Sequence, residues 1–139
     1  MAMGEAMMVA GVGCRRGTSA AAIETVIAAA LARAGLASGA LDVIAVPAAK
    51  CDEPGIAAAA SALGLRLVLI AQLDLESAGR RVETHSQRVM TLMGVPSVAE
   101  AAALAAGGPA ARLVLPRIAI GPATCALASS GVTIPEAAP

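Results

Sequence analysis

Residues 11–19, Gly-Val-Gly-Cys-Arg-Arg-Gly-Thr-Ser, combine glycines, two adjacent arginines and two hydroxyl residues. An apolar run precedes them and an alanine-rich helical pattern follows, which predicts a turn between a strand and a helix N-terminus. Backbone N–H groups and the helix dipole favour an anion at such a turn, and arginine matches carboxylate or phosphate oxygens. The turn is therefore either a receptor for an acidic ligand or an ordinary βα turn with Thr18 or Ser19 as the N-cap.

The spacing of these residues fits neither of the familiar nucleotide-binding loops. Gly11, Gly13 and Gly17 are spaced one residue too far apart for the dinucleotide fingerprint. No lysine follows Gly17, as a Walker loop would require. Any acidic ligand is therefore bound in another way.

A second polar turn, residues 50–53, follows the second apolar run. Lys50 could bind a ligand carboxylate or be a solvated loop charge. Asp52 and Glu53 could act as acid or base. They could instead pair with Arg15, Arg16 or Lys50, or lie in the first turn of the next helix, where anions are favoured. We expect one of these structural roles for the two carboxylates.

Cys14 is a candidate nucleophile, since a helix N-terminus and two arginines would lower its pKa. It could equally be a small buried residue at a strand end, and we favour this role because no base lies nearby in sequence. Cys51 could approach Cys14, but two thiols without a third ligand are weak evidence for a metal. We predict no catalytic residue, no metal site and no cofactor.

The elements that position these residues alternate between strands and helices. Helical periodicity over 19–33 and just beyond predicts one apolar face made of Ile23, Val26, Ile27, Ala30, Leu31 and Ala34. The third strand is apolar almost throughout, which predicts burial on both faces. Ser97 and Glu100 have the spacing of a capping box. The predicted strands are 7–13, 41–46, 65–71, 112–116 and 124–128, with a hairpin or long turn at 118–121. The predicted helices are 19–33, 54–63, 97–106 and two short helices within 72–93, where we expect Met90 and Met93 to be core residues. We expect the tail from Ser129 to be loose.

This order predicts an α/β fold, namely a three-layer α/β/α single domain with a four- or five-stranded, mostly parallel sheet. We expect one domain over 1–139 with an ordered core at about 6–128. Ligands of open sheets bind beyond the carboxyl ends of the strands. The turns at 14–18 and 50–53 both lie at that edge, so we expect them to converge.

Composition excludes several classes of partner. The chain has 139 residues, is 58% hydrophobic, and carries 10 basic and 10 acidic residues. A neutral chain without Phe, Tyr or Trp offers neither a general field nor stacking platforms for nucleic acid. No stretch is apolar over the length of a membrane span, and no secretory signal is evident. Three cysteines without C-x-x-C spacing suit a reducing compartment, so we expect a cytoplasmic protein.

The first motif, followed by Lys-Cys-Asp-Glu-Pro-Gly at 50–55, resembles the CobE family of cobalamin-biosynthesis proteins, which includes the C-terminal domain of CbiG. The similarity covers about residues 6–128, including the segments 98–104 and 112–117. It implies a role in cobalamin (vitamin B12) biosynthesis and a corrin or precorrin ligand. Such ligands carry several carboxylates around a flat apolar ring. The implied substrate-binding residues are Gly13, Cys14, Arg15, Arg16, Gly17, Thr18, Ser19, Lys50, Asp52, Glu53 and Arg117.

Two functions remain open from the resemblance. The protein binds a corrin intermediate or product and passes it between pathway enzymes, or it is an enzyme or enzyme subunit that acts on a precorrin lactone or side chain. The missing catalytic constellation favours the first. His85 could bind cobalt below the ring, but the D-x-H-x-x-G pattern is absent, and a polar loop is the expected context.

Overall fold

The computed structural model describes residues 7–50 and 52–130. Five strands form one sheet in the order β3–β2–β1–β5–β4. β1, β2 and β3 pair in parallel, whereas β5 pairs antiparallel with both β1 and β4, so β5 alone runs against the other four. The predicted α/β fold with a mostly parallel sheet is confirmed. The strands are β1 (Met8–Cys14), β2 (Val43–Pro47), β3 (Arg66–Ile70), β4 (Arg112–Ile120) and β5 (Ala123–Ser129).

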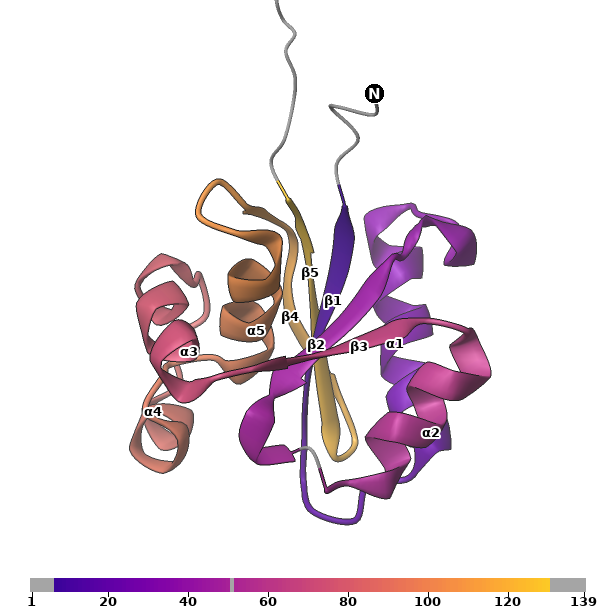
Figure 1. Cartoon of the computed structure of the whole chain (residues 1–139), viewed down its shortest axis with the longest axis horizontal. Coiled ribbons are helices and arrows are strands. Elements are labelled where there is room, and N and C mark those ends of the chain that lie inside the picture. The colour runs from indigo at the N-terminus through magenta and orange to yellow at the C-terminus, as the bar shows by residue number, and fades with distance from the viewer. Residues whose placement is uncertain (1–6, 51, 131–139) are drawn as a thin grey trace, which may run out of the picture.

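Helices cover both faces of the sheet and make three layers (Figure 1). One face is covered by α1 (Ala20–Ala34) and α2 (Pro54–Leu63). The other is covered by α5 (Val98–Gly107) and α3 (Gln72–Ala78). The short helix α4 (Gln87–Met93) lies between α3 and α5 in the chain. Single 3₁₀ turns complete the helical segments: η1 (Ser38–Ala40), η2 (Ala48–Lys50) and η3 (Gly79–Arg81).

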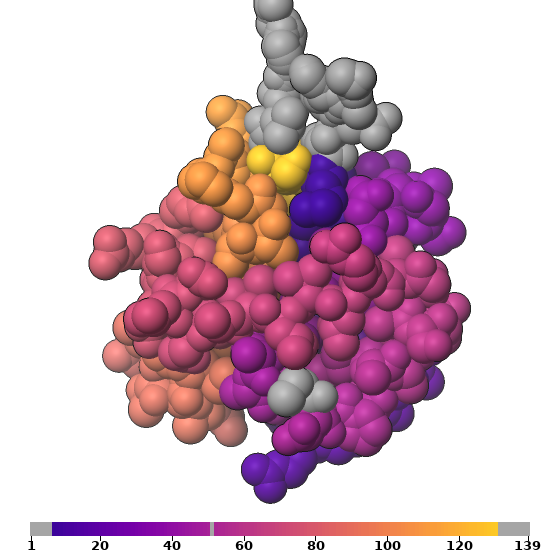
Figure 2. All heavy atoms as spheres, viewed as in Figure 1, coloured from indigo at the N-terminus to yellow at the C-terminus, as the bar shows by residue number. Residues whose placement is uncertain are grey.

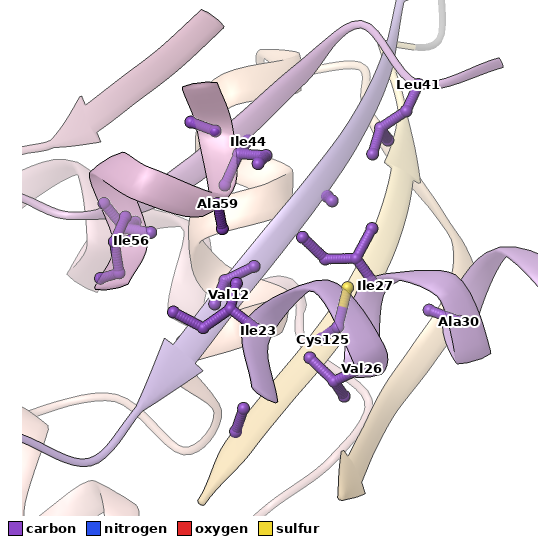
Figure 3. Close-up of a cluster of buried hydrophobic side chains, with 14 of the residues drawn as sticks. Val12, Ile23, Val26, Ile27, Ala30, Leu41, Ile44, Ile56, Ala59 and Cys125 are labelled. Carbon is purple, nitrogen blue, oxygen red and sulfur yellow. The ribbon is translucent and has the colours of Figure 1, made fainter. Parts of the chain in front are cut away.

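The larger apolar core lies between the sheet and α1 with α2. The predicted face of α1 is confirmed for Ile23, Val26, Ile27, Ala30 and Leu31, which are all buried. Ala34, at the end of the helix, is only partly buried against the same core. Figure 3 shows this face against side chains of β1, β2 and β5, including the fully buried Cys125. Ser19 caps the helix by accepting a hydrogen bond from the N–H of Ala22. The periodicity and the cap therefore determine α1 together.

On the opposite face, α5 approaches the sheet very closely. The core there is rich in alanine, with Ala101, Ala102 and Ala103 fully buried. Gly11 of β1 lies directly under the helix, because a Cβ placed on it would be 1.9 Å from the carbonyl oxygen of Ala99. Only a residue without a side chain fits at this point. A chain without aromatic residues thus fills this layer by backbone contact.

Two strands differ from the sequence-based prediction. β3 was expected to be buried on both faces, but it is an edge strand, and Leu69 is 46% exposed. Apolar content alone does not distinguish an edge strand from a central one. β4 extends to Ile120, beyond the predicted end at 116, so the turn is confined to Gly121 and Pro122. The turn predicted at 118–121 therefore overlaps the observed turn only at Gly121.

The C-terminal boundary was also misplaced. Ser129 belongs to β5 and pairs with Met8 of β1. Ser130 continues the contact, since its N–H donates to the carbonyl of Met7 and its hydroxyl accepts from the N–H of Met7. The tail predicted to begin at Ser129 therefore begins no earlier than residue 131. The rest of that prediction lies outside the described residues.

Helix α4 is the least embedded helix. None of its residues is buried, and Leu92 is 69% exposed. The prediction that Met90 belongs to the core is wrong, because it is 47% exposed, whereas Met93 packs against the core. Within the described part of the chain, no single helix is long and apolar enough to cross a membrane. The helices α4 and α5 have sufficient combined length and apolar character, but the chain bends by 64° between them.

Candidate functional site

Four separate segments meet at one end of the molecule, opposite the start of β1 and the end of β5 (Figure 1). They are the turn after β1, the 3₁₀ turn after β2, the turn between β4 and β5, and helix α4. In the space-filling view the turn after β1 protrudes at this end (Figure 2). Its Arg15 N–H donates to the carbonyl of Pro122, 3.0 Å away, which joins it to the β4–β5 turn. The two polar turns predicted to converge are indeed at the same edge.

The link between the two polar turns is a direct hydrogen bond. The N–H of Gly17 donates to the Oε1 atom of Glu53, 2.8 Å away. Helix α2 begins against the same turn, because a Cβ on Gly55 would be 2.1 Å from the carbonyl oxygen of Thr18. Glu53 therefore holds the first turn rather than pairing with an arginine there. The glycine that follows Pro54 allows the two backbones to touch.

A cavity of about 490 Å³ opens between these segments. Four cationic side chains line it: Arg15, Lys50, Arg88 and Arg117. No aspartate, glutamate or histidine is among the described residues that line it. The chain as a whole has equal numbers of acidic and basic residues, so this cavity concentrates one sign of charge. Such an arrangement raises the local concentration of anions.

One wall of the cavity is apolar. Helix α4 contributes Val89, Leu92 and Met93, and Val98 of α5 lies beside them. Pro47 and Pro122 add further aliphatic surface. A ligand that combines an apolar body with several carboxylates would find a matching partner for each part. No described residue offers an aromatic ring for stacking, because the chain has none.

The structure brings only part of the predicted residue set to the cavity. Gly13, Cys14, Arg15, Lys50 and Arg117 line it. The residues of the set that do not line it are Arg16, Gly17, Thr18, Ser19, Asp52 and Glu53.

The hydroxyl residues of the first turn have structural partners. Thr18 is 6% exposed, and its hydroxyl donates to the carbonyl of Arg15 over 2.6 Å. Ser19 is the N-cap of α1. These two side chains shape the loop that presents Arg15. The turn after β1 can therefore be an ordinary capped βα turn and still present Arg15 to an anion.

Cys14 lies in the cavity wall with a protonated thiol. Burial raises its pKa above the ordinary value; nearby Lys50 and a hydrogen bond with the Thr18 side chain oppose this, and Glu53 adds to it. The lowered pKa that a nucleophile at this turn would need is absent. A structural role for Cys14 agrees with this. Cys51, the suggested second thiol, lies outside the described residues.

We expect Cys14 to be alkylated slowly at neutral pH. Since the thiolate is the reactive form, the iodoacetamide rate should rise about tenfold per pH unit from pH 7 up to its raised pKa. Mass spectrometry of the Cys14 peptide in a Cys51→Ser background measures this rate. Cys125 is the internal control, because complete burial raises its pKa to about 12. A rate that levels off below pH 8 would contradict the expectation.

Arg88 was missed because it lies in the part of the sequence whose structure was least clear. Its only sequence signal is a serine before a short apolar pattern, and Ser86 does cap α4 by accepting from the N–H of Val89. That signal predicts a helix and says nothing about what the helix faces. Ser86 also lines a second cavity of about 380 Å³, together with His85.

The less favoured alternative for His85, a cobalt ligand, gains no support from the residues around it. Among residues 7–50 and 52–130, no group of three His, Cys, Asp or Glu side chains could hold a metal ion. His85 is exposed in the segment before α4. Its role as a cobalt ligand stays untested.

Glu100 was interpreted as half of a capping box, and that interpretation is wrong. Ser97 does cap α5 by accepting from the N–H of Glu100. The Glu100 carboxylate, however, accepts from the backbone N–H groups of Glu83, Thr84 and Arg117. Burial by itself would raise its pKa, but the hydrogen bonds from Arg117, Thr84 and Glu83 together hold the pKa below the ordinary value. Glu100 is therefore a buried carboxylate at neutral pH.

Comparisons with known proteins give a consistent result. Residues 8–128 match the family model described as "Cobalamin synthesis G C-terminus". The chain is 37% identical over 121 residues to Protein CobE of Sinorhizobium sp, covering 87% of this chain and 79% of that protein.

Solved structures agree. A crystal structure of CobE, from the cobalamin (vitamin B12) biosynthetic pathway, superposes with a TM-score of 0.85 at 32% identity, over 93% of this chain and 94% of that one. The cobalamin biosynthesis protein chiG of Agrobacterium tumefaciens str. C58 gives 0.70 at 40% identity, over 88% and 97%. A putative cobalamin biosynthesis protein G homolog of Sulfolobus solfataricus, 21% identical, gives 0.66 over 89% of this chain and 37% of that one, and shares the fold.

Proposed function

This chain belongs to the cobalamin synthesis G C-terminus family, and we propose that it binds a corrin or precorrin polycarboxylate in the cavity beyond β1 and β2. It then passes this molecule between enzymes of the pathway, in the cytoplasm. The observation that carries the proposal is the cavity with four cations, no acidic residue among its described lining and one apolar wall. Arg15, Lys50, Arg88 and Arg117 bind the carboxylates, and α4 with Val98 contacts the ring.

The charge pattern favours acids over amides. A charge-assisted hydrogen bond contributes about 1.5–3 kcal/mol, and converting a carboxylate to an amide removes the charge. Several such bonds made at once would separate a polycarboxylate from its amidated form by orders of magnitude. The ligand is therefore the acid form of the macrocycle.

The alternative, an enzyme acting on a precorrin lactone or side chain, needs a base or a nucleophile. The described residues lining the cavity include no carboxylate or histidine to act as a base, and the raised pKa of the Cys14 thiol disfavours it as a nucleophile. This supports binding without chemistry. Replacing Cys14 with serine separates the two functions, since binding survives if the residue is structural and turnover is lost if it reacts.

We expect a purified corrin polycarboxylate to bind with a change in its visible absorbance. Titration at two salt concentrations measures the affinity. Since exposed charges are screened by salt, affinity should fall as salt rises. The matched control is the same macrocycle with its side chains fully amidated, which should bind at least a hundredfold more weakly. Failure of the polycarboxylate to bind at low salt would remove the proposed function.

A pull-down tests the identity of the natural ligand. The tagged protein is expressed in cells that make corrins, and the eluate is examined by absorbance spectroscopy and mass spectrometry. A pigmented polyacid in the eluate supports the proposal. A colourless eluate from cells shown to contain free corrin acids counts against it.

A further inference from the structure

Glu100 is unusual among the charged residues that the structure describes, because it alone is fully buried. Burying a carboxylate is costly unless hydrogen bonds replace its water. Ser97 already caps α5, so the helix does not need the Glu100 side chain. The hydrogen bonds that offset the cost of burying Glu100 come from backbone N–H groups outside α5.

The two oxygens of Glu100 face two different segments. Oε1 accepts from the N–H of Glu83 at 2.7 Å and from the N–H of Thr84 at 2.9 Å. Oε2 accepts from the N–H of Arg117 at 2.8 Å. The segments lie 16 or 17 residues away in the chain on either side. One carboxylate thus joins both of them to α5.

Each segment carries a wall of the cavity. Thr84 precedes Ser86, the N-cap of α4, and α4 brings Arg88 to the cavity. Arg117 lies in β4 between Leu115 and Ile118, where the register with β5 shifts. Irregular strand segments of this kind redirect side chains and leave N–H groups outside the ladder. Glu100 accepts the N–H of Arg117 at this irregularity.

Besides Glu100, the α4 segment is held by the N–H of Ser86, which donates to the carbonyl of Pro96, and by the Gln72 side chain, which donates to the carbonyl of Met93. Helix α4 has no buried residue. β4 is an edge strand, with β5 as its only neighbour in the sheet. The other two cations, Arg15 and Lys50, follow central strands and do not touch Glu100. The carboxylate therefore acts on two of the four cations.

We propose that Glu100 is a positioning residue for the ligand cavity, fixing Arg117 directly and Arg88 through residues 83–86. The effect on ligand binding rests on the proposed function, whereas the effect on the two segments does not. Glutamine is a poor replacement, because its NH₂ group would face an N–H donor. Aspartate keeps the charge but is one methylene too short to reach both segments.

Hydrogen exchange tests the positioning role without any ligand. In Glu100→Gln, peptides covering 83–93 and 115–119 should exchange at least tenfold faster, whereas peptides of α1 and α2 should not change. The matched control is Ser97→Ala, which removes a buried hydrogen bond of the same helix but leaves both segments attached. Faster exchange throughout the protein, or none in the two segments, would overturn the proposal.

Binding of the corrin polycarboxylate gives the second readout. Glu100→Gln should weaken it at least tenfold in wild type, but less than twofold in an Arg88→Ala/Arg117→Ala background, because the groups it positions are gone. An equal loss in both backgrounds would show a merely structural role. Should Glu100→Gln not fold, Glu100→Asp is measured in the same way. Absence of binding by the wild type would refute the proposed function, while the exchange data would still decide the role of Glu100.

Discussion

Replacing Gly11 with alanine is expected to remove a large part of the stability of the fold. The new Cβ would lie 1.9 Å from the Ala99 carbonyl oxygen and 2.6 Å from the Ala103 nitrogen. Both are backbone atoms of α5, so no side-chain rotation relieves the clash. The helix must move away from β1, which opens the alanine-rich layer on that face of the sheet.

The size of this effect follows from how little the core can adjust. Inserting a methyl group into a packed core costs about 1–3 kcal/mol when side chains can shift, and here an entire helix must move. We expect a loss of about 4 kcal/mol or more, out of about 5–15 kcal/mol for a typical domain.

Urea denaturation followed by circular dichroism measures this loss. Gly39→Ala is the matched control, since no atom lies within 4 Å of its new Cβ and its φ is not positive. The control should remain within about 0.5 kcal/mol of wild type. A Gly11→Ala variant as stable as the control would show that α5 does not lie on β1 in this way.

Removing Arg15 and Arg117 together should reduce affinity for a corrin polycarboxylate by about a hundredfold to ten-thousandfold. Each arginine is expected to make a charge-assisted hydrogen bond worth about 1.5–3 kcal/mol. The two come from different elements, the turn after β1 and strand β4, so they contact different parts of the ligand and their losses should largely add.

Absorbance titration of the Arg15→Ala/Arg117→Ala variant measures this loss. Arg112→Ala is the matched control, because Arg112 is an exposed arginine of the same strand β4 that does not line the cavity. It changes the net charge without changing the cavity, so its effect should be less than about threefold. Equal affinities for the double variant and the wild type would place the ligand elsewhere.

The candidate site was half predictable. The turn at Arg15 and the residue Lys50 follow strands whose carboxyl ends must share an edge, so the rule for open parallel sheets brought them together. Arg88 and Glu100 could not be found in this way. Their relation to the cavity depends on how α4 and α5 lie over the sheet, and the sequence of a short helix carries no signal for that.

The amino-acid sequence by itself determined the local structure. Apolar periodicity defined the buried face of α1, Ser19 and Ser97 determined where helices begin, and glycines marked where they end. These signals act over a few residues, so they survive without knowledge of the fold.

Tertiary structure alone decided which distant residues meet. It made β3 an edge strand and extended β4 past Pro116. It also placed the Glu100 carboxylate against backbone N–H groups 16 and 17 residues away instead of against the N-terminus of its own helix. The physical reason is that burial and hydrogen-bond satisfaction are properties of the packed layers. A residue pair such as Gly13 and Thr124, hydrogen-bonded across 111 positions, has no local pattern to announce it.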